Sequence, residues 1–265
     1  MHPAEAARYA AAVLGPIESV EPVQGFAGNQ TFRVHSTRGM TAYLKTGAAI
    51  GIEAAAIDRA AAAGIPVPQI LASSHAGPPP YLILAEAAGA PSDDPAVLVQ
   101  AVHALRRLHG LHSDEADWGE ILTPLIDDLG NLEDIVPDDL AERLRVIMPP
   151  FIAEVAGVRP SLLHGDIHAR HLYAADGELT AILDWGDACY GDPLYDLARL
   201  TITADEDAVL AAYGLPRTGK LQKALSRYRV LWSLRALHAE HAARGDWFDP
   251  HVRRIEAEIG AEQLS

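Results

Sequence analysis

Along this chain, the spacing of apolar residues changes from short strand-like runs to long helical repeats. In the first third, short apolar stretches are separated by turn residues such as glycine, and this pattern predicts strands joined by hairpins, with helices beside them. The predicted elements are a helix over 4–14, strands over 19–23, 31–34 and 41–45, a helix over 52–63 and a strand over 81–86. These residues therefore predict a small antiparallel sheet.

The remaining two thirds of the chain are predicted to be mainly helical. Leucine and valine residues between 98 and 108 recur at spacings of four, three and three, which places them on one face of a helix over 95–111. Further helices are predicted over 140–147, 205–213 and 219–243. The consecutive prolines Pro149 and Pro150 are expected to break the chain after the first of these, because proline disrupts a helix interior.

The small-residue segment Ala88-Gly89-Ala90-Pro91 is the best candidate for a linker between the two parts. A boundary there gives an N-terminal lobe of residues 1–88 and a C-terminal lobe of residues 89–265. The expected fold class is α+β, with a small antiparallel-sheet lobe followed by a larger, mainly helical lobe.

Composition and charge exclude several classes of protein and of binding site. The 265 residues are 49% hydrophobic, enough to form buried cores, and no run approaches the roughly 20 apolar residues of a membrane helix. The start of the chain lacks a basic segment before its apolar stretch, so a cytoplasmic protein is expected, as a monomer or weak homodimer. The net charge of −15 argues against nucleic-acid binding. The single Cys189 excludes an intramolecular disulfide and a thiolate zinc site.

The richest chemistry lies between residues 164 and 196. His164, Asp166, His168 and His171 fall within eight residues, and Asp184 follows after a predicted turn at 176–177 and a strand over 179–183. This arrangement suits a reaction in which a base and a divalent cation face one bound group. A second interpretation is a metallohydrolase, because three histidines and an aspartate could coordinate zinc directly.

Three motifs in this region carry a resemblance to a known family. They are HGDIHARH at 164–171, ILDW at 182–185 and GDPLYDLA at 191–198. With the elements that precede them, they make the chain similar to the aminoglycoside phosphotransferase family, which includes choline-kinase-like and macrolide kinases. The resemblance implies a bilobal, protein-kinase-like fold and transfer of the γ-phosphate of ATP or GTP to a hydroxyl group, with Mg²⁺.

The resemblance also implies roles for individual residues. Asp166 would be the catalytic base, Asp184 would hold magnesium, and Lys45 would bind phosphates with Glu53 as its helix partner. The rest of the nucleotide site would consist of Gly25, Gly28 and Asn29 in a hairpin loop and of Glu86 and Ala88 near the linker. His164, His168 and Asp196 would support the catalytic loop, although His168 could also approach the phosphate.

His171 departs from the common family pattern. Most members carry an asparagine five residues after the catalytic aspartate, where it helps to hold a magnesium ion, and macrolide phosphotransferases are similar to this chain in having histidine. A neutral imidazole can bind a divalent ion, so His171 is a second metal-ligand candidate and Mn²⁺ is an alternative to Mg²⁺. The same departure motivates a further alternative, a catalytically impaired binding module.

The acceptor is expected to be a small and cationic molecule. Between residues 114 and 142 there are eleven acidic residues and no lysine or arginine. These residues form either solvated helix faces or a rim that attracts cations. An aminoglycoside, a macrolide or another basic antibiotic would fit, and an amino alcohol or a small sugar is the alternative. The candidate substrate contacts are Asp114, Asp117, Trp118, Trp232, Glu240, Asp246 and Trp247.

Overall fold

A computed structural model describes residues 1–23, 29–75 and 79–261 of the chain. The chain forms two compact units. The N-terminal unit consists of Met1–Ala104 together with Ala169–Ala188, and the C-terminal unit consists of Leu105–His168 together with the chain from Cys189 onwards. The predicted loop glycines Gly25 and Gly28 lie outside the described residues. The predicted lobe boundary after residue 88 stays a prediction.

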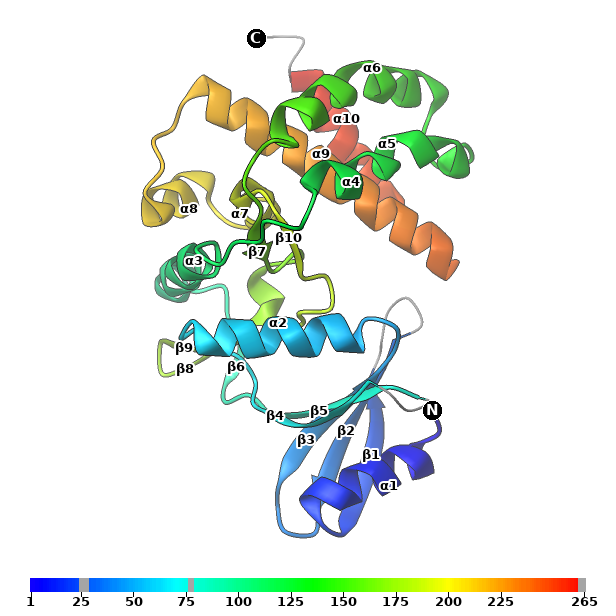
Figure 1. Ribbon diagram of the computed structural model, residues 1–265, viewed down its shortest axis with the longest axis vertical. Coiled ribbons are helices and arrows are strands. Elements are labelled where there is room, and N and C mark those ends of the chain that lie inside the picture. Colours follow the sequence, from blue (N-terminus) through cyan, green and yellow to red (C-terminus); the bar gives the residue numbers. More distant parts are fainter. Residues whose placement is uncertain (24–28, 76–78, 262–265) are drawn as a thin grey trace. The chain divides into compact units, whose positions relative to one another are not determined.

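A five-stranded antiparallel sheet forms the centre of the N-terminal unit (Figure 1). Its strands lie in the order β1-β2-β3-β5-β4, which confirms the predicted antiparallel sheet and adds one strand, β4, that the sequence pattern did not predict. The elements are α1 (Pro3–Leu14), β1 (Ile17–Val23), β2 (Gln30–Ser36), β3 (Thr41–Thr46), α2 (Ile50–Ala62), β4 (Ile70–Ser74) and β5 (Tyr81–Ala85).

The two faces of this sheet carry different side chains, because successive side chains along a strand point to opposite faces. Phe32 of β2 and Leu44 of β3 are buried in one core with Ala10 and Leu14 of α1. The residue after Leu44, Lys45, must therefore point to the opposite face, and there it meets Glu53 of α2. The alternation of apolar and polar residues along β3 thus fixes which side of the sheet carries the lysine.

A smaller sheet of β6 (Ala90–Pro91), β8 (Leu172–Ala175) and β9 (Glu178–Ile182) completes the N-terminal unit. The 3-10 helix η2 (Ala169–His171) leads directly into β8. The turn between β8 and β9 contains Asp176 and Gly177, both with positive φ, as a tight hairpin turn requires. The hairpin predicted around residues 176–177 is therefore confirmed.

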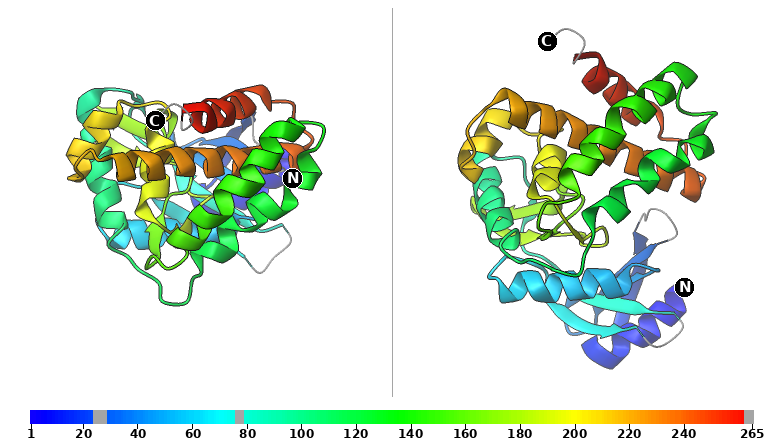
Figure 2. Two further views of the ribbon diagram at one scale, coloured as in Figure 1. Left: turned by 90° about the horizontal axis from the view of Figure 1, so that it is seen from above. Right: turned by 45° about the horizontal axis from the view of Figure 1, so that its top comes forward.

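The C-terminal unit is mainly helical. In it, α10 packs along α9, and both views of Figure 2 show the two helices side by side. Helix α3 (Pro95–Leu108) begins in the N-terminal unit and ends in the C-terminal unit. The other elements of the C-terminal unit are α4 (Trp118–Leu122), α5 (Pro124–Asp127), η1 (Asp128–Leu132), α6 (Asp138–Val155), β7 (Ser161–Leu163), β10 (Cys189–Gly191), α7 (Pro193–Leu200), α8 (Glu206–Tyr213), α9 (Gly219–Ala243) and α10 (Asp249–Ala261). Among the described residues, no helix has the length and apolar character needed to cross a membrane.

The predicted break at Pro149 and Pro150 is wrong, because α6 continues through both prolines to Val155. A proline inside a helix costs about 3 kcal/mol or more, since it removes a hydrogen bond and crowds the preceding turn. The buried side chains of α6 offset this cost, because each fully buried leucine, isoleucine, valine or methionine side chain contributes about 1.5–3 kcal/mol. These side chains are Leu140, Ala141, Leu144, Met148, Ile152 and Val155, and they continue on both sides of the prolines.

An aromatic cluster with one buried carboxylate anchors the start of α7. The indole N–H of Trp118 donates to the hydroxyl of Tyr228 at 3.3 Å, and that hydroxyl donates to Oδ2 of Asp192 at 2.8 Å. Asp192 caps α7 by accepting the backbone N–H of Leu194. Gly191 lies so close that a Cβ there would come within 2.4 Å of the Trp118 ring. The fold of this region therefore depends on a polar contact inside an apolar cluster.

Tyr228→Phe tests this dependence. Loss of the hydroxyl removes the donor to Oδ2 of the buried Asp192 carboxylate and the acceptor of the Trp118 N–H, so we expect a loss of about 1–3 kcal/mol in the free energy of unfolding. Urea titration followed by circular dichroism measures it. Tyr81→Phe is the matched control, since no hydrogen bond of the Tyr81 hydroxyl is recorded among the described residues, and its effect should stay within about 0.5 kcal/mol. Equal effects of the two substitutions would contradict this account.

Candidate active site

Asp184 lies two residues beyond the end of β9, at an unusual backbone position. The N–H of Leu183 donates to the carbonyl of His171 at 2.9 Å, which holds the chain as it leaves the strand. Asp184 then adopts a φ of 64°, in the left-handed region that side chains other than glycine visit rarely. Its side chain is 54% exposed. Backbone strain of this kind clusters at functional sites, and here it directs a carboxylate toward solvent.

Lys45 joins two carboxylates within the N-terminal unit. Its Nζ donates to Oε1 of Glu53 at 2.5 Å and to Oδ1 of Asp184 at 2.7 Å. The side chains of Lys45 and Glu53 are only 18% and 4% exposed. Burial alone would lower the pKa of Lys45, but the charges of Glu53 and Asp184 outweigh burial and raise it. The ammonium group is therefore held charged and in one place.

His171 lies beside the same aspartate. Its Nε2 is 3.6 Å from Oδ2 of Asp184. Carboxylate oxygen is the ligand that Mg²⁺ prefers, and imidazole nitrogen binds Mn²⁺ as well. An exposed carboxylate, a neighbouring imidazole and a fixed ammonium group are chemically suited to a divalent cation bound to a polyphosphate, so these residues fit the metal and the nucleotide expected from the sequence.

In the C-terminal unit, Asp196 of α7 holds the predicted catalytic loop. Its carboxylate accepts the backbone N–H groups of His164 at 2.8 Å and Gly165 at 2.9 Å, and it also accepts from Nε2 of His109 at 3.0 Å. Burial would raise the pKa of Asp196, but the His109 bond, the nearby histidines and the Gly165 amide together lower it. Asp196 is therefore an ionised carboxylate surrounded by donors.

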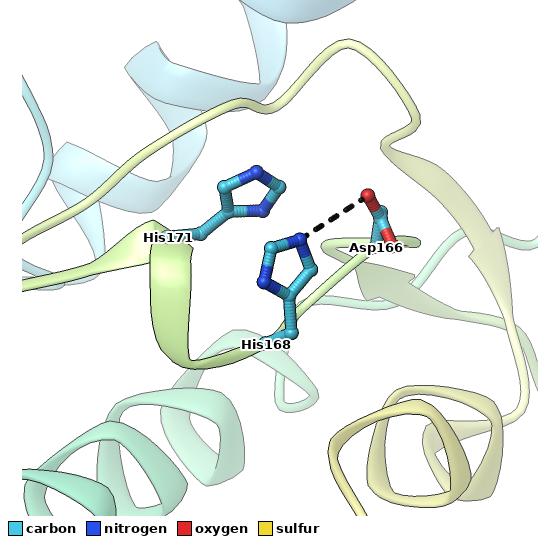
Figure 3. A group of neighbouring side chains, drawn as sticks. All are labelled: Asp166, His168 and His171. Atoms are coloured by element: carbon cyan, nitrogen blue, oxygen red, sulfur yellow. Dashed lines mark ion pairs between the residues drawn. The ribbon is translucent and has the colours of Figure 1, made fainter. Parts of the chain in front are cut away.

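The loop then presents Asp166. The N–H of Asp166 donates to Nδ1 of His164 at 3.3 Å, and His164 itself is fully buried. Figure 3 shows Asp166 beside His168, with 3.8 Å between Oδ2 of Asp166 and Nε2 of His168, and His171 three residues further along the chain. His168 is buried, whereas the Asp166 side chain is 27% exposed. The polar contacts of His164 thus brace the loop from inside, and Asp166 keeps access to solvent.

Two residues at this site were not predicted from the sequence. Arg199 donates through Nε to Oδ1 of Asp166 at 2.7 Å, and His109 contacts Asp196 as described above. Arg199 follows Asp196 by three residues on α7, so helical spacing could have indicated that both side chains face the same loop. No comparable signal exists for His109, which is separated from Asp196 by 87 residues.

The other residues predicted for the nucleotide site lie in the N-terminal unit. Asn29 lies next to Gly47, where an added Cβ would come within 2.0 Å of the asparagine Oδ1. Glu86 is exposed and accepts from Arg33 at 2.7 Å. The carbonyl of Ala88 accepts from the Thr180 hydroxyl at 2.6 Å, which ties the predicted linker to β9.

The predicted substrate contacts lie in different environments within the C-terminal unit. Asp114 and Asp246 are exposed, and Asp117 caps α4 by accepting the N–H groups of Gly119 and Glu120. Trp118 is fully buried in the aromatic cluster and Glu240 is buried at the end of α9, so both have packing positions.

Two tryptophans are connected to Asp166 through intervening side chains. The guanidinium group of Arg199 lies 3.9 Å above the ring of Trp232. His251 contacts Trp232 on one side and the exposed Trp247 on the other, with ring centroids 5.4 and 5.1 Å apart. Of the seven predicted substrate contacts, Trp232 is thus linked to Asp166 through Arg199, and Trp247 is linked to Trp232 through His251.

Solved structures share this fold along nearly the whole chain. A choline/ethanolamine kinase family protein from Mesorhizobium loti is 24% identical, with 99% of this chain and 95% of that chain covered and a TM-score of 0.72. A macrolide 2′-phosphotransferase from Brachybacterium faecium is 16% identical, with 96% and 97% covered and a TM-score of 0.67. A thermostable mutant of an aminoglycoside phosphotransferase, in ternary complex with ADP and hygromycin B, is 15% identical, with 96% and 98% covered and a TM-score of 0.67.

These likenesses confirm the α+β, protein-kinase-like fold expected from the sequence. The profile of the phosphotransferase enzyme family matches residues 19–231, well over half of the chain, and includes all three motifs between 164 and 198. The chain therefore belongs to the phosphotransferase enzyme family.

Proposed function

We propose that this phosphotransferase transfers the γ-phosphate of ATP or GTP to a hydroxyl group of a small cationic molecule. The proposal rests on the position of the Lys45 ammonium group, which is fixed between Glu53 and the exposed Asp184. An ammonium held in one place can neutralise phosphate oxygens without reorganising at the moment of reaction. Nucleotide use is further supported by the ADP in the ternary complex of the aminoglycoside phosphotransferase.

In the proposed reaction, the acceptor oxygen forms a bond to the γ-phosphorus while the bond from that phosphorus to the β–γ bridging oxygen breaks, leaving a nucleoside diphosphate. Asp166 orients the acceptor hydroxyl and accepts its proton. Lys45 binds the phosphates, and Asp184 together with His171 would hold the divalent cation. When bound, that cation neutralises negative charge on the phosphate oxygens.

The surface charge supports a cationic acceptor. All eleven acidic residues between positions 114 and 142 are exposed, and they raise the local concentration of cations at the C-terminal unit. An aminoglycoside or macrolide would meet this requirement, as would an amino alcohol. The related structures include proteins named for each of these acceptor classes, so the scaffold accommodates all of them.

Membership of a phosphotransferase family leaves the metallohydrolase alternative without support. One member of its proposed ligand set, His164, is buried and uses Nδ1 to accept the Asp166 N–H. The alternative of an impaired binding module is disfavoured because the chain retains both Asp166 and Asp184, and because Asp184 contacts Lys45.

A thermal-shift screen tests the ligand classes. Mg²⁺ with ATP or GTP is expected to raise the unfolding midpoint, because a ligand at 100 times its Kd stabilises the native state by about 2.7 kcal/mol. A cationic aminoglycoside, macrolide or amino alcohol should raise it further, and Lys45→Met should remove the nucleotide shift. Stabilisation by an uncharged sugar, with none by any cationic compound, would overturn the proposed acceptor charge.

Asp166→Asn tests the proposed base. We expect kcat for phosphoryl transfer to fall by about 10²- to 10⁴-fold, the usual contribution of a general base. The nucleotide-dependent thermal shift should persist, because the phosphates are assigned to Lys45 and the divalent cation to Asp184 and His171. Asp176→Asn is the matched control, since it removes the same charge at an exposed hairpin turn whose positive φ asparagine tolerates. Undiminished turnover by Asp166→Asn would refute the assignment.

Asp196→Asn tests the proposed loop support through its pH dependence. An amide in this position would turn an NH₂ group toward surrounding donors, so we expect a loss of about 3 kcal/mol in the free energy of unfolding at neutral pH. The folded-state pKa of Asp196 lies below its ordinary value of 3.8. Its stabilisation is therefore complete above that value and is lost as the pH falls through the lower folded-state pKa.

Urea titrations of both proteins at a series of pH values measure this difference. The gap between the wild type and Asp196→Asn should be constant between about pH 6 and 8 and should shrink below about pH 4. A gap that widens on acidification would contradict an ionised, donor-surrounded carboxylate.

A further inference from the structure

Arg199 is the strongest feature of the site that neither the motifs nor the proposed reaction explains. Its Nε donates to Oδ1 of Asp166 at 2.7 Å, and its side chain is only 7% exposed. A charge-assisted hydrogen bond from a buried guanidinium group is stronger than one between neutral groups. The contact joins an arginine on the last turn of α7 to the proposed catalytic carboxylate.

Arg199 is itself held from a second direction. Its guanidinium group lies 3.9 Å from the centroid of the Trp232 ring, in the geometry of a cation–π contact. Trp232 extends from α9 and packs against the buried His251 of α10. Arg199 is therefore fixed between a carboxylate on one side and an aromatic ring on the other, and both partners belong to the C-terminal unit.

This arrangement limits how Asp166 can turn. Rotation of an aspartate carboxylate about its last torsion is broad and has no strong intrinsic preference. A bond from Arg199 to Oδ1 therefore decides where Oδ2 points. Asp196, three residues earlier on α7, holds the backbone of His164 and Gly165. The same helix thus fixes the loop backbone and the orientation of the carboxylate that the loop presents.

We propose that Arg199, held by Trp232, is a positioning residue that orients the Asp166 carboxylate toward the acceptor hydroxyl. This inference rests on the proposed function, because it gives Arg199 a role only if Asp166 is the base. It also gives Trp232, predicted from the sequence as a substrate contact, a different role as the support for the arginine.

The contact requires arginine in particular. A planar guanidinium group can lie flat on the indole ring while its edge donates to the carboxylate. A lysine ammonium carries the same charge but cannot stack and donate at the same time. Arg199→Lys therefore separates the effect of charge from the effect of orientation.

The experiment is a double-mutant cycle on Arg199 and Asp166. Turnover is measured with Mg–ATP and Mg–GTP, with water as the acceptor wherever no compound of the screen is phosphorylated. In the wild-type background, Arg199→Ala is expected to lower kcat by about 100-fold, the loss that a misplacement of about 1 Å produces. Arg199→Lys should recover only a minor part of that loss.

In the Asp166→Asn background, the same Arg199→Ala change should lower kcat by less than about 3-fold, because residues that act as one unit are not additive. Arg254→Ala is the matched control: it removes another arginine near the Trp232 ring, 6.0 Å from its centroid, with no contact to Asp166 recorded among the described residues. This control should keep kcat within about 3-fold of the wild type.

Three outcomes separate the possible failures. The nucleotide-dependent thermal shift of Arg199→Ala should equal that of the wild type, which shows that the variant is folded and binds nucleotide. A 100-fold loss in both the wild-type and the Asp166→Asn backgrounds would overturn the positioning role while leaving the kinase function intact. A wild-type protein that transfers no phosphate from either nucleotide would instead refute the proposed function itself.

Discussion

The buried carboxylate of Asp196 is the constraint on which the proposed catalytic loop depends. Burying a carboxylate away from solvent costs free energy unless hydrogen-bond donors surround it. Asp196 accepts hydrogen bonds from two backbone amides and from His109. Those amides belong to His164 and Gly165, directly before Asp166, and Gly165 has a φ of 85° that favours glycine. The need to satisfy one carboxylate therefore sets the backbone path that ends at the proposed base.

The site in the N-terminal unit also depends on the balance between the cost of burying charged groups and their attraction to one another. Burial raises the pKa of Glu53, against the attraction of Lys45. The ammonium group of Lys45 has a second partner in Asp184, whose carboxylate is largely exposed. One partner therefore anchors the lysine inside the unit while the other remains accessible to a metal ion or a phosphate. The positive φ of Asp184 is the local cost of that access.

The sequence predicted what local patterns determine. Short apolar runs separated by turn residues predicted the sheet, the Asp176-Gly177 turn predicted the hairpin, and the family resemblance implied Glu53 as the partner of Lys45, a pair that the structure contains. It could not predict contacts between distant segments. Pro149 and Pro150 suggested a helix end because propensity is local, whereas the burial that overrides it comes from tertiary packing.

The short helix α7, which begins within the motif over 191–198 and ends just beyond it, holds the proposed catalytic loop. Asp192, Asp196 and Arg199 are separated by four and three residues, so they lie along one face of a helix. The first is bonded to Tyr228 in the aromatic cluster, the second holds the loop backbone, and the third bonds to the Asp166 carboxylate.

The two aspartates of this face also differ in a way that their donors explain. Asp192 has two donors, and burial raises its pKa; Asp196 has three donors beside nearby histidines, and its pKa is lowered despite complete burial. A change in the phase of this helix would disconnect all three contacts at once. Helical spacing is therefore the physical requirement that links the core of the C-terminal unit to the orientation of the proposed base.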